Sequence, residues 1–98
     1  MEKRQDKRFK TRQIVKVCGK IGVVNDISNS GIQLSTAYAP KNRTLDISID
    51  ANGGEISFIG IIQWVKWKKQ LQSLNEMGII IKDAPLEYLD FVKKFNKS

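Results

Sequence analysis

The chain has 98 residues and a formal net charge of +7, with no histidine and a single cysteine, Cys18. This length predicts one domain with one modest core. The apolar runs are too short to span a bilayer, and the charged N-terminus lacks the apolar region of a secretory signal. A lone cysteine excludes an intrachain disulfide, and the missing histidine removes the usual zinc sites and the commonest general base. We therefore expect a cytoplasmic protein that is not an enzyme, holds no metal or cofactor and is not inserted in a membrane.

The positive charge is concentrated in two places. The first twelve residues contain Lys3, Arg4, Lys7, Arg8, Lys10 and Arg12 against only two acidic residues. A second group consists of Lys66, Lys68 and Lys69. Such an excess indicates an anionic partner, for example a nucleotide or a nucleic acid. For the lysines, a solvated surface without a partner is an equally good interpretation.

The hydrophobic pattern predicts six strands followed by one helix. Residues 1–10 have no usable period and are expected to form a flexible leader. Strands are predicted over about 11–17, 20–27, 32–36, 44–49, 55–68 and 74–82. The link at 18–20 is predicted to be a tight hairpin turn, and residues 28–31 have turn chemistry.

The longest predicted strand, 55–68, has apolar residues on both faces. One face is expected to carry Ile56, Phe58, Ile62 and Trp64, and the other Ile59, Ile61, Val65 and Trp67. Such a strand passes from one packing layer to another, as strands of a barrel do. Gly60 is a candidate for the bend that this path needs.

The period becomes helical after residue 83. The apolar stripe of the predicted helix, 84–96, consists of Tyr88, Phe91, Val92 and Phe95. Asp83 is the candidate N-cap, and a proline follows near the first turn. We expect this amphipathic helix to cover an opening or a face of the barrel.

Two short motifs carry the functional signal. Arg4 and Arg8 form the pattern RxxxR, and Asp26, Ser28 and Gly31 form the pattern DxSxxG in a turn between two strands. In this order, within a small β-rich chain, the motifs resemble the PilZ domain, the bacterial receptor module for cyclic di-GMP. The resemblance covers nearly the whole chain and includes the segments Trp64-Val65-Lys66 and Met77-Gly78-Ile79. It implies an all-β fold, a six-stranded antiparallel PilZ-type β-barrel with a C-terminal α-helix. The chain would be a single domain over 1–98, with a leader at 1–10, a barrel at 11–82 and a helix at 84–96.

The motif residues suit a cyclic dinucleotide. A guanidinium can donate two bonds to the O6 and N7 atoms of a guanine, or clamp a phosphate. The carboxylate of Asp26 can accept from the N1–H and N2–H₂ groups, and Gly31 leaves bare backbone beside the ligand. By resemblance, Asp26, Ser28 and Gly31 form the fixed half of the site, whereas Arg4 and Arg8 form the mobile half.

Two further residues are candidates for ligand contact. In the family, the residue before the first motif arginine, here Lys3, influences whether one or two cyclic di-GMP molecules bind. Trp64 is expected either near the ligand or in the core. A second register of the arginine motif, Arg8 with Arg12, leaves too few residues before Asp26 for the usual pair of strands.

The leading hypothesis is a cyclic di-GMP receptor and adaptor, which changes conformation on binding and signals to a separate effector protein. One alternative is a small basic barrel that binds single-stranded nucleic acid through Trp64, Trp67, Lys66, Lys68 and Lys69. The two tryptophans are predicted on opposite faces of one strand, which argues against this nucleic-acid platform. The other alternative is a PilZ adaptor that binds no ligand.

Overall fold

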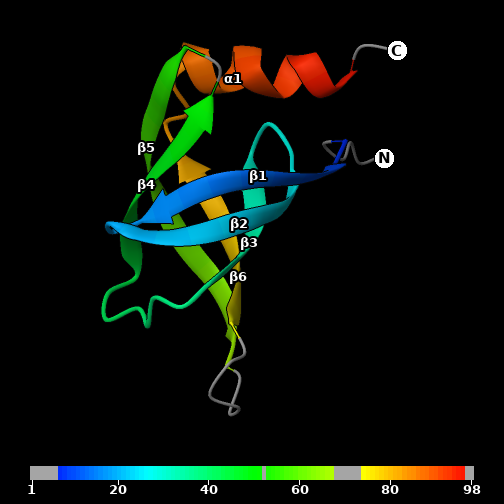
Figure 1. Cartoon of the computed structure of the whole chain (residues 1–98). Coiled ribbons are helices and arrows are strands. Elements are labelled where there is room, and N and C mark those ends of the chain that lie inside the picture. The colour runs from blue at the N-terminus through cyan, green and yellow to red at the C-terminus, as the bar shows by residue number, and fades with distance from the viewer. Residues whose placement is uncertain (1–6, 52, 68–73, 97–98) are drawn as a thin grey trace.

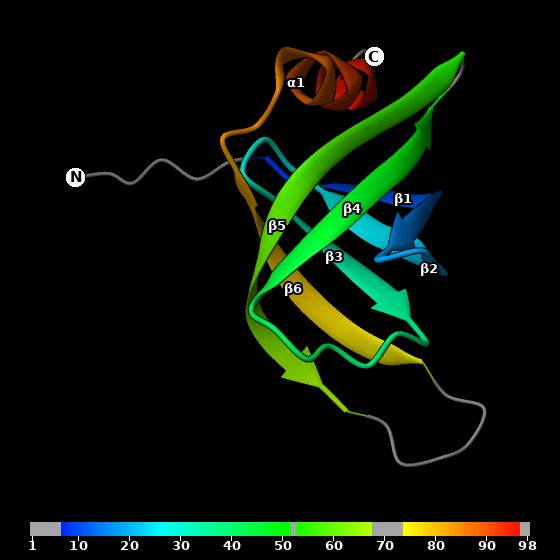
Figure 2. The ribbon, with the colours of Figure 1, turned by 90° about the vertical axis from the view of Figure 1, so that its left-hand side faces the viewer.

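The six predicted strands close into an antiparallel barrel, and the predicted helix lies across one end of it (Figures 1 and 2). The computed structural model describes residues 7–51, 53–67 and 74–96. Its elements are β1 (Phe9–Val17), β2 (Lys20–Ile27), β3 (Gly31–Thr36), β4 (Thr44–Ala51), β5 (Gly54–Lys66), β6 (Asn75–Lys82), α1 (Leu86–Lys93) and the 3₁₀ helix η1 (Lys94–Asn96). The order around the barrel is β1-β2-β3-β6-β5-β4, and β4 pairs with β1 to close it. The predicted fold class is therefore confirmed.

Several element boundaries differ from the prediction by one or two residues, and helix α1 begins at Leu86, two residues after its predicted start. β1 begins at Phe9, within the segment assigned to the leader, because Phe9 and Lys10 pair with Ile27 and Asp26 of β2. The last strand begins at Asn75 and β5 ends at Lys66, so each is slightly shorter than predicted. Residues 1–6, where the rest of the predicted leader falls, lie outside the described part of the chain.

Alternation along the strands builds the core. Side chains at every second position point into the barrel, where they are almost completely buried; the fully buried ones include Val15, Val17, Val24, Ile27, Leu34, Ile49 and Met77. Gly60 of β5 belongs to this inner face, and a Cβ atom there would overlap the side chains of Ile79 and Ile47. Its small size therefore serves close packing in the core.

Register shifts interrupt the strand pairing between Lys10 and Gln13 of β1 and at two bulges, one in β2 and one in β5. In β2, Val24 pairs with Leu34 whereas Asp26 pairs with Gln33, so Asn25 is an extra residue. A bulge changes which face the following side chains occupy. Asp26 consequently points away from the core, although it is two residues from the fully buried Val24.

The second bulge corrects the prediction for β5. Ile62 pairs with Ile79 and Trp64 pairs with Gly78, which leaves Gln63 as the extra residue. Phe58 and Ile62 pack in or against the core as predicted, but Trp64 is 41% exposed and points outward. The prediction that Trp64 shares the face of Phe58 and Ile62 is wrong because the bulge reverses the alternation between them.

Helix α1 closes one end of the barrel with the predicted apolar stripe. Tyr88, Phe91 and Val92 are buried, and the Tyr88 ring meets Phe58 edge to face, with 5.0 Å between ring centroids. The predicted cap is wrong, since Pro85 is the N-cap residue and no side chain caps the helix. Asp83 instead has a φ of 47°, in the chain reversal between β6 and α1.

The Tyr88 hydroxyl also ties α1 to the turn between β2 and β3. It donates a hydrogen bond of 2.6 Å to the carbonyl oxygen of Ser28, and both residues are fully buried. A weaker contact of 3.4 Å reaches the carbonyl oxygen of Gly31. Helix packing and turn conformation are thus linked by one buried hydroxyl.

We expect Tyr88→Phe to lower the free energy of unfolding by about 1–3 kcal/mol, because it leaves a buried carbonyl without its strongest donor. Urea unfolding followed by circular dichroism measures this change. Tyr38→Phe is the matched control, since Tyr38 is only half-buried; its effect should stay below about 0.5 kcal/mol. Equal stabilities of the two variants would contradict a structural role for the Tyr88 hydroxyl.

Gly31, the last residue of the DxSxxG motif, is required by the close approach of β3 and β6. A Cβ atom at this position would lie 2.5 Å from the carbonyl oxygen of Ile79, a backbone atom that cannot move aside. This packing supplies a reason for glycine that is independent of any ligand, whereas the sequence interpretation gave the turn and the approach of a ligand as the reasons.

We expect Gly31→Ala to destabilise the barrel by about 1–3 kcal/mol through this overlap, again measured by urea unfolding. Gly54→Ala, at the start of β5, serves as the control because no atom lies within 4 Å of the added methyl group. It should change stability by less than about 1 kcal/mol, with either sign. A Gly31→Ala protein as stable as the Gly54→Ala protein would refute the packing explanation.

Candidate functional site

The strand register places four residues in one row across the outer wall of the barrel. From β2 through β3 and β6 to β5, the paired residues are Asp26, Gln33, Gly78 and Trp64. Directly paired residues of antiparallel strands point to the same face. The rows on either side, which contain Leu34 and Ile32 of β3, point into the core. The intervening row therefore lies on the outer wall, although Asp26 and Gly78 are themselves buried there, and two of its members reach it only through the bulges at Asn25 and Gln63.

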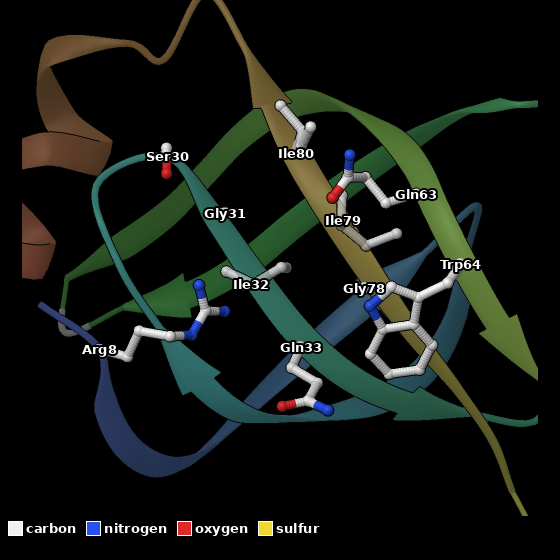
Figure 3. A pocket seen from close by; sticks show the side chains of 10 residues that line it. All are labelled: Arg8, Ser30, Gly31, Ile32, Gln33, Gln63, Trp64, Gly78, Ile79 and Ile80. Atoms are coloured by element: carbon white, nitrogen blue, oxygen red, sulfur yellow. The ribbon is translucent and has the colours of Figure 1, made fainter. Parts of the chain in front are cut away.

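A groove of about 450 Å³ lies along this row (Figure 3). It is lined by Arg8, Ser30, Gly31, Ile32, Gln33, Gln63, Trp64, Gly78, Ile79 and Ile80. The hollow exists because Gly31 and Gly78 carry no side chains on the outer face of β3 and β6. At Gly78, a Cβ atom would lie 2.5 Å from Cε2 of the Trp64 indole, so the indole lies directly against the glycine backbone.

Trp64 thus belongs to the groove and not to the core. Its side chain is one of the exposed large hydrophobic groups, and Figure 3 shows the indole at one end of the groove, across from Arg8. Of the two expectations for Trp64, the core position is wrong. Trp67, the other tryptophan, lies just beyond the end of β5, is 57% exposed and does not line the groove.

Arg8 lines the other end of the groove and contacts two further predicted site residues that lie behind it. The Arg8 guanidinium donates from Nε and from Nη2 to the same carboxylate oxygen of Asp26, Oδ1, at 2.9 and 2.6 Å. Its third nitrogen, Nη1, lies 3.5 Å from the hydroxyl oxygen of Ser28. Residues 18 and 20 positions apart in the chain are therefore assembled into one polar cluster, as the two motifs predict.

The turn between β2 and β3 fixes this cluster. The Ser28 hydroxyl accepts a hydrogen bond from the N–H of Gly31 and donates to the carbonyl of Gly31, both at 3.2 Å, and the Ser28 N–H donates to the same carbonyl at 2.9 Å. Ser28 is fully buried. It therefore builds the turn, and its hydroxyl reaches the groove only through Arg8.

The strength of the Arg8–Asp26 pair follows from its exposure. The Arg8 side chain is 48% exposed and the Asp26 side chain 11%. Solvent screens the charge of the half-exposed Arg8, which weakens the pair. Asp26 is largely buried, so its carboxylate needs a hydrogen-bond donor, and a ligand can replace Arg8 only by supplying one.

Two predicted residues, Lys3 and Arg4, fall outside the described part of the chain, so their positions relative to the groove are not described. Arg12, the second arginine of the alternative register, does not line the groove. It lines a separate shallow hollow with Lys10, Thr11 and Asn25 on β1 and β2. This placement favours Arg8 as the last arginine of the motif.

The sequence interpretation did not name Gln33, Gln63 or Ile80 as groove residues. Gln33 could have been found, since it alternates with the apolar residues Ile32 and Leu34 immediately after the motif. Gln63 gives no such signal because it is the bulge residue itself.

Among residues 7–51, 53–67 and 74–96, no three Cys, Asp or Glu side chains gather as a metal site requires, and no helix is long and apolar enough to cross a membrane. Away from the groove, a hydrogen bond with Cys18, desolvation and the charge of Cys18 raise the pKa of Tyr38 above its ordinary value of 10.0.

The barrel is similar to a solved structure of the Bacillus subtilis inhibitor of motility (MotI/DgrA), with a TM-score of 0.70 and 14% sequence identity. The match covers 100% of this chain and 54% of that chain, so this chain spans about half the length of the inhibitor. No family model matches the chain, and no curated protein matches it significantly in sequence. At 14% identity the likeness establishes a shared fold, a six-stranded barrel with a C-terminal helix.

Proposed function

We propose that this chain is a cyclic di-GMP receptor of the PilZ type, a cytoplasmic adaptor without catalytic activity that signals to a separate protein. The observation that carries the proposal is the cluster of Arg8, Asp26 and Ser28 at one end of an exposed groove. These residues belong to two motifs whose ordered combination resembles the ligand-binding signature of the family.

The cluster has the chemistry that a guanine nucleotide needs. Asp26 presents acceptors for the N1–H and N2–H₂ groups of a guanine, and the guanidinium of Arg8 suits the O6 and N7 atoms or a phosphate. Because Arg8 holds Oδ1 of Asp26 with two nitrogens, a guanine that takes both carboxylate oxygens must displace it. The displaced arginine is then free to contact the ligand, and the N1–H and N2–H₂ donors of the guanine replace its hydrogen bonds to the largely buried carboxylate.

Arg4 supplies the second guanidinium in this proposal, as the motif implies. Lys3, Lys7 and Lys10 add positive charge to the same segment, which favours an anionic ligand and makes binding weaker at high salt.

The adaptor part of the proposal is supported by the fold that the chain shares with an inhibitor of motility. If the ligand changes affinity for the effector, linkage requires the effector to change affinity for the ligand by the same factor.

We expect calorimetric titration with cyclic di-GMP to show saturable binding, with no comparable binding of GTP or cyclic di-AMP. Arg8→Ala should weaken cyclic di-GMP binding by about tenfold to a hundredfold, since charge-assisted hydrogen bonds contribute about 1.5–3 kcal/mol. The matched control is Arg12→Ala, which removes the same charge from the neighbouring hollow and should change affinity by less than about threefold.

The outcomes of these experiments distinguish the receptor function from the two alternative functions. Absence of heat and of a thermal shift, in protein shown to be folded, would favour an adaptor that binds no ligand. Binding of single-stranded DNA or RNA at moderate salt, if it is lost in the Trp67→Ala and Lys66→Ala variants, would favour a nucleic-acid-binding function. Equal losses of cyclic di-GMP affinity in the Arg8→Ala and Arg12→Ala variants would mean that the two arginines contribute only their charge.

A further inference from the structure

Arg8, which holds Asp26, lines one end of the groove, and Trp64, the further candidate for ligand contact, forms the other end. Trp64 is held there by specific features of the fold. The bulge at Gln63 turns it out of the core, and the absence of a side chain at Gly78 lets its indole lie against the strand. The result is a half-exposed aromatic side chain within a groove, a platform on which a nucleobase can stack for about 1–3 kcal/mol.

Gln33 borders the same space. It pairs directly with Gly78 across β3 and β6, it is half-buried, and it lines the groove. No hydrogen bond joins its amide to another of the described residues. The Gln33 amide, which can both donate and accept hydrogen bonds, therefore lies beside the Trp64 indole with its hydrogen-bonding groups available to a ligand.

The row of paired residues sets the distance between the two ends. Asp26 and Gly78 are separated by two strand spacings, which corresponds to about 10 Å. One base of a cyclic dinucleotide can then meet Asp26 while the other stacks on the exposed face of the Trp64 indole, which itself covers Gly78, and lies beside Gln33.

The two ends differ in what they can recognise. A carboxylate only accepts hydrogen bonds, so Asp26 fits the N1–H and N2–H₂ donors of guanine and rejects adenine, whose N1 is itself an acceptor. The Gln33 amide both donates and accepts. It can pair with the O6 and N1–H groups of guanine, and equally with a ring nitrogen and the N6–H₂ group of adenine.

We propose that Gln33 and Trp64 form a second, permissive base subsite, so that the protein binds a mixed cyclic dinucleotide of one guanine and one adenine as well as cyclic di-GMP. This inference rests on the proposed function, because it places the first guanine at Asp26. It adds that specificity is asymmetric: one end of the groove requires guanine, and the other accepts either purine.

Titration calorimetry with three ligands tests the inference. Cyclic di-GMP and the mixed 3′,3′-cyclic GMP–AMP should bind within about tenfold of one another, because only the permissive end differs between them. Cyclic di-AMP should bind at least about a hundredfold more weakly, because the acceptor N1 of an adenine would face the carboxylate of Asp26, which is also an acceptor.

Gln33→Glu provides the sharpest variant. It replaces the amide by a carboxylate of the same shape and should make the second subsite guanine-specific, so that the affinity ratio of cyclic di-GMP to cyclic GMP–AMP rises at least about tenfold. Gln63→Glu is the matched control, as it adds the same charge to the groove from the bulge. Repulsion between the added carboxylate and the ligand phosphates should then lower the affinity for both ligands equally and leave the affinity ratio unchanged.

Fluorescence tests the stacking directly, because the chain has two tryptophans. In Trp67→Phe protein the remaining indole, Trp64, should be quenched as either ligand saturates the site. In Trp64→Phe protein, emission from Trp67 should not change at the same ligand concentrations.

The outcomes distinguish this inference from the proposed function. If cyclic di-GMP binds and cyclic GMP–AMP binds a hundredfold more weakly, the permissive subsite is refuted and the receptor function stands. Equal changes of the affinity ratio in Gln33→Glu and Gln63→Glu would also refute it. If no cyclic dinucleotide binds to folded protein, both proposals fail together.

Discussion

Two extra residues, Asn25 in β2 and Gln63 in β5, determine which side chains this barrel presents on its outer wall. A strand alternates with a period of two, so each bulge exchanges the inner and outer faces beyond it. Without the bulge at Asn25, Asp26 would share the face of Val24 and bring a carboxylate into an apolar core, which costs several kcal/mol unless the charge is paired. Without the bulge at Gln63, Trp64 would point inward. The groove and its polar cluster depend on these two local departures from ideal pairing.

Most of the fold was predictable from the sequence because each strand carries its own signal. Ile32 and Leu34, for example, alternate with polar residues, and glycine, asparagine or proline marks most of the turns. The stripe that contains Tyr88 and Phe91 predicts a helix that packs on one face, as the structure confirms. Barrel closure does not follow from periodicity alone. It was predicted from the resemblance to a known family, and the pairing of β1 with β4 confirms it.

The candidate site was predictable in part. Arg8, Asp26, Ser28 and Gly31 are brought together as the two motifs imply, and each of them contributes to the cluster or to the turn beneath it. The outward position of Trp64 was not predictable, because β5 has apolar residues on both faces, so the sequence does not show where its alternation shifts. The steric requirement for glycine at position 31 was not predictable either, because only the three-dimensional structure shows that the carbonyl oxygen of Ile79 approaches it. Neighbouring strands therefore determine what local sequence cannot.

The two ends of the described chain meet beside the polar cluster, and this arrangement limits how Arg8 can move. Phe9, the next residue, stacks on Phe95 of η1 with 6.2 Å between ring centroids, and Phe95 in turn meets Phe91 of α1 edge to face. The Tyr88 hydroxyl joins the same helix to the turn that carries Ser28. A ligand that only rotates the Arg8 side chain leaves these contacts intact. A ligand that draws the backbone of Arg8 across the groove must separate Phe9 from Phe95, an aromatic contact worth about 0.5–1.5 kcal/mol beyond the buried area. Because that energy is small compared with charge-assisted bonds to a dinucleotide, binding at the groove can alter the surface around η1.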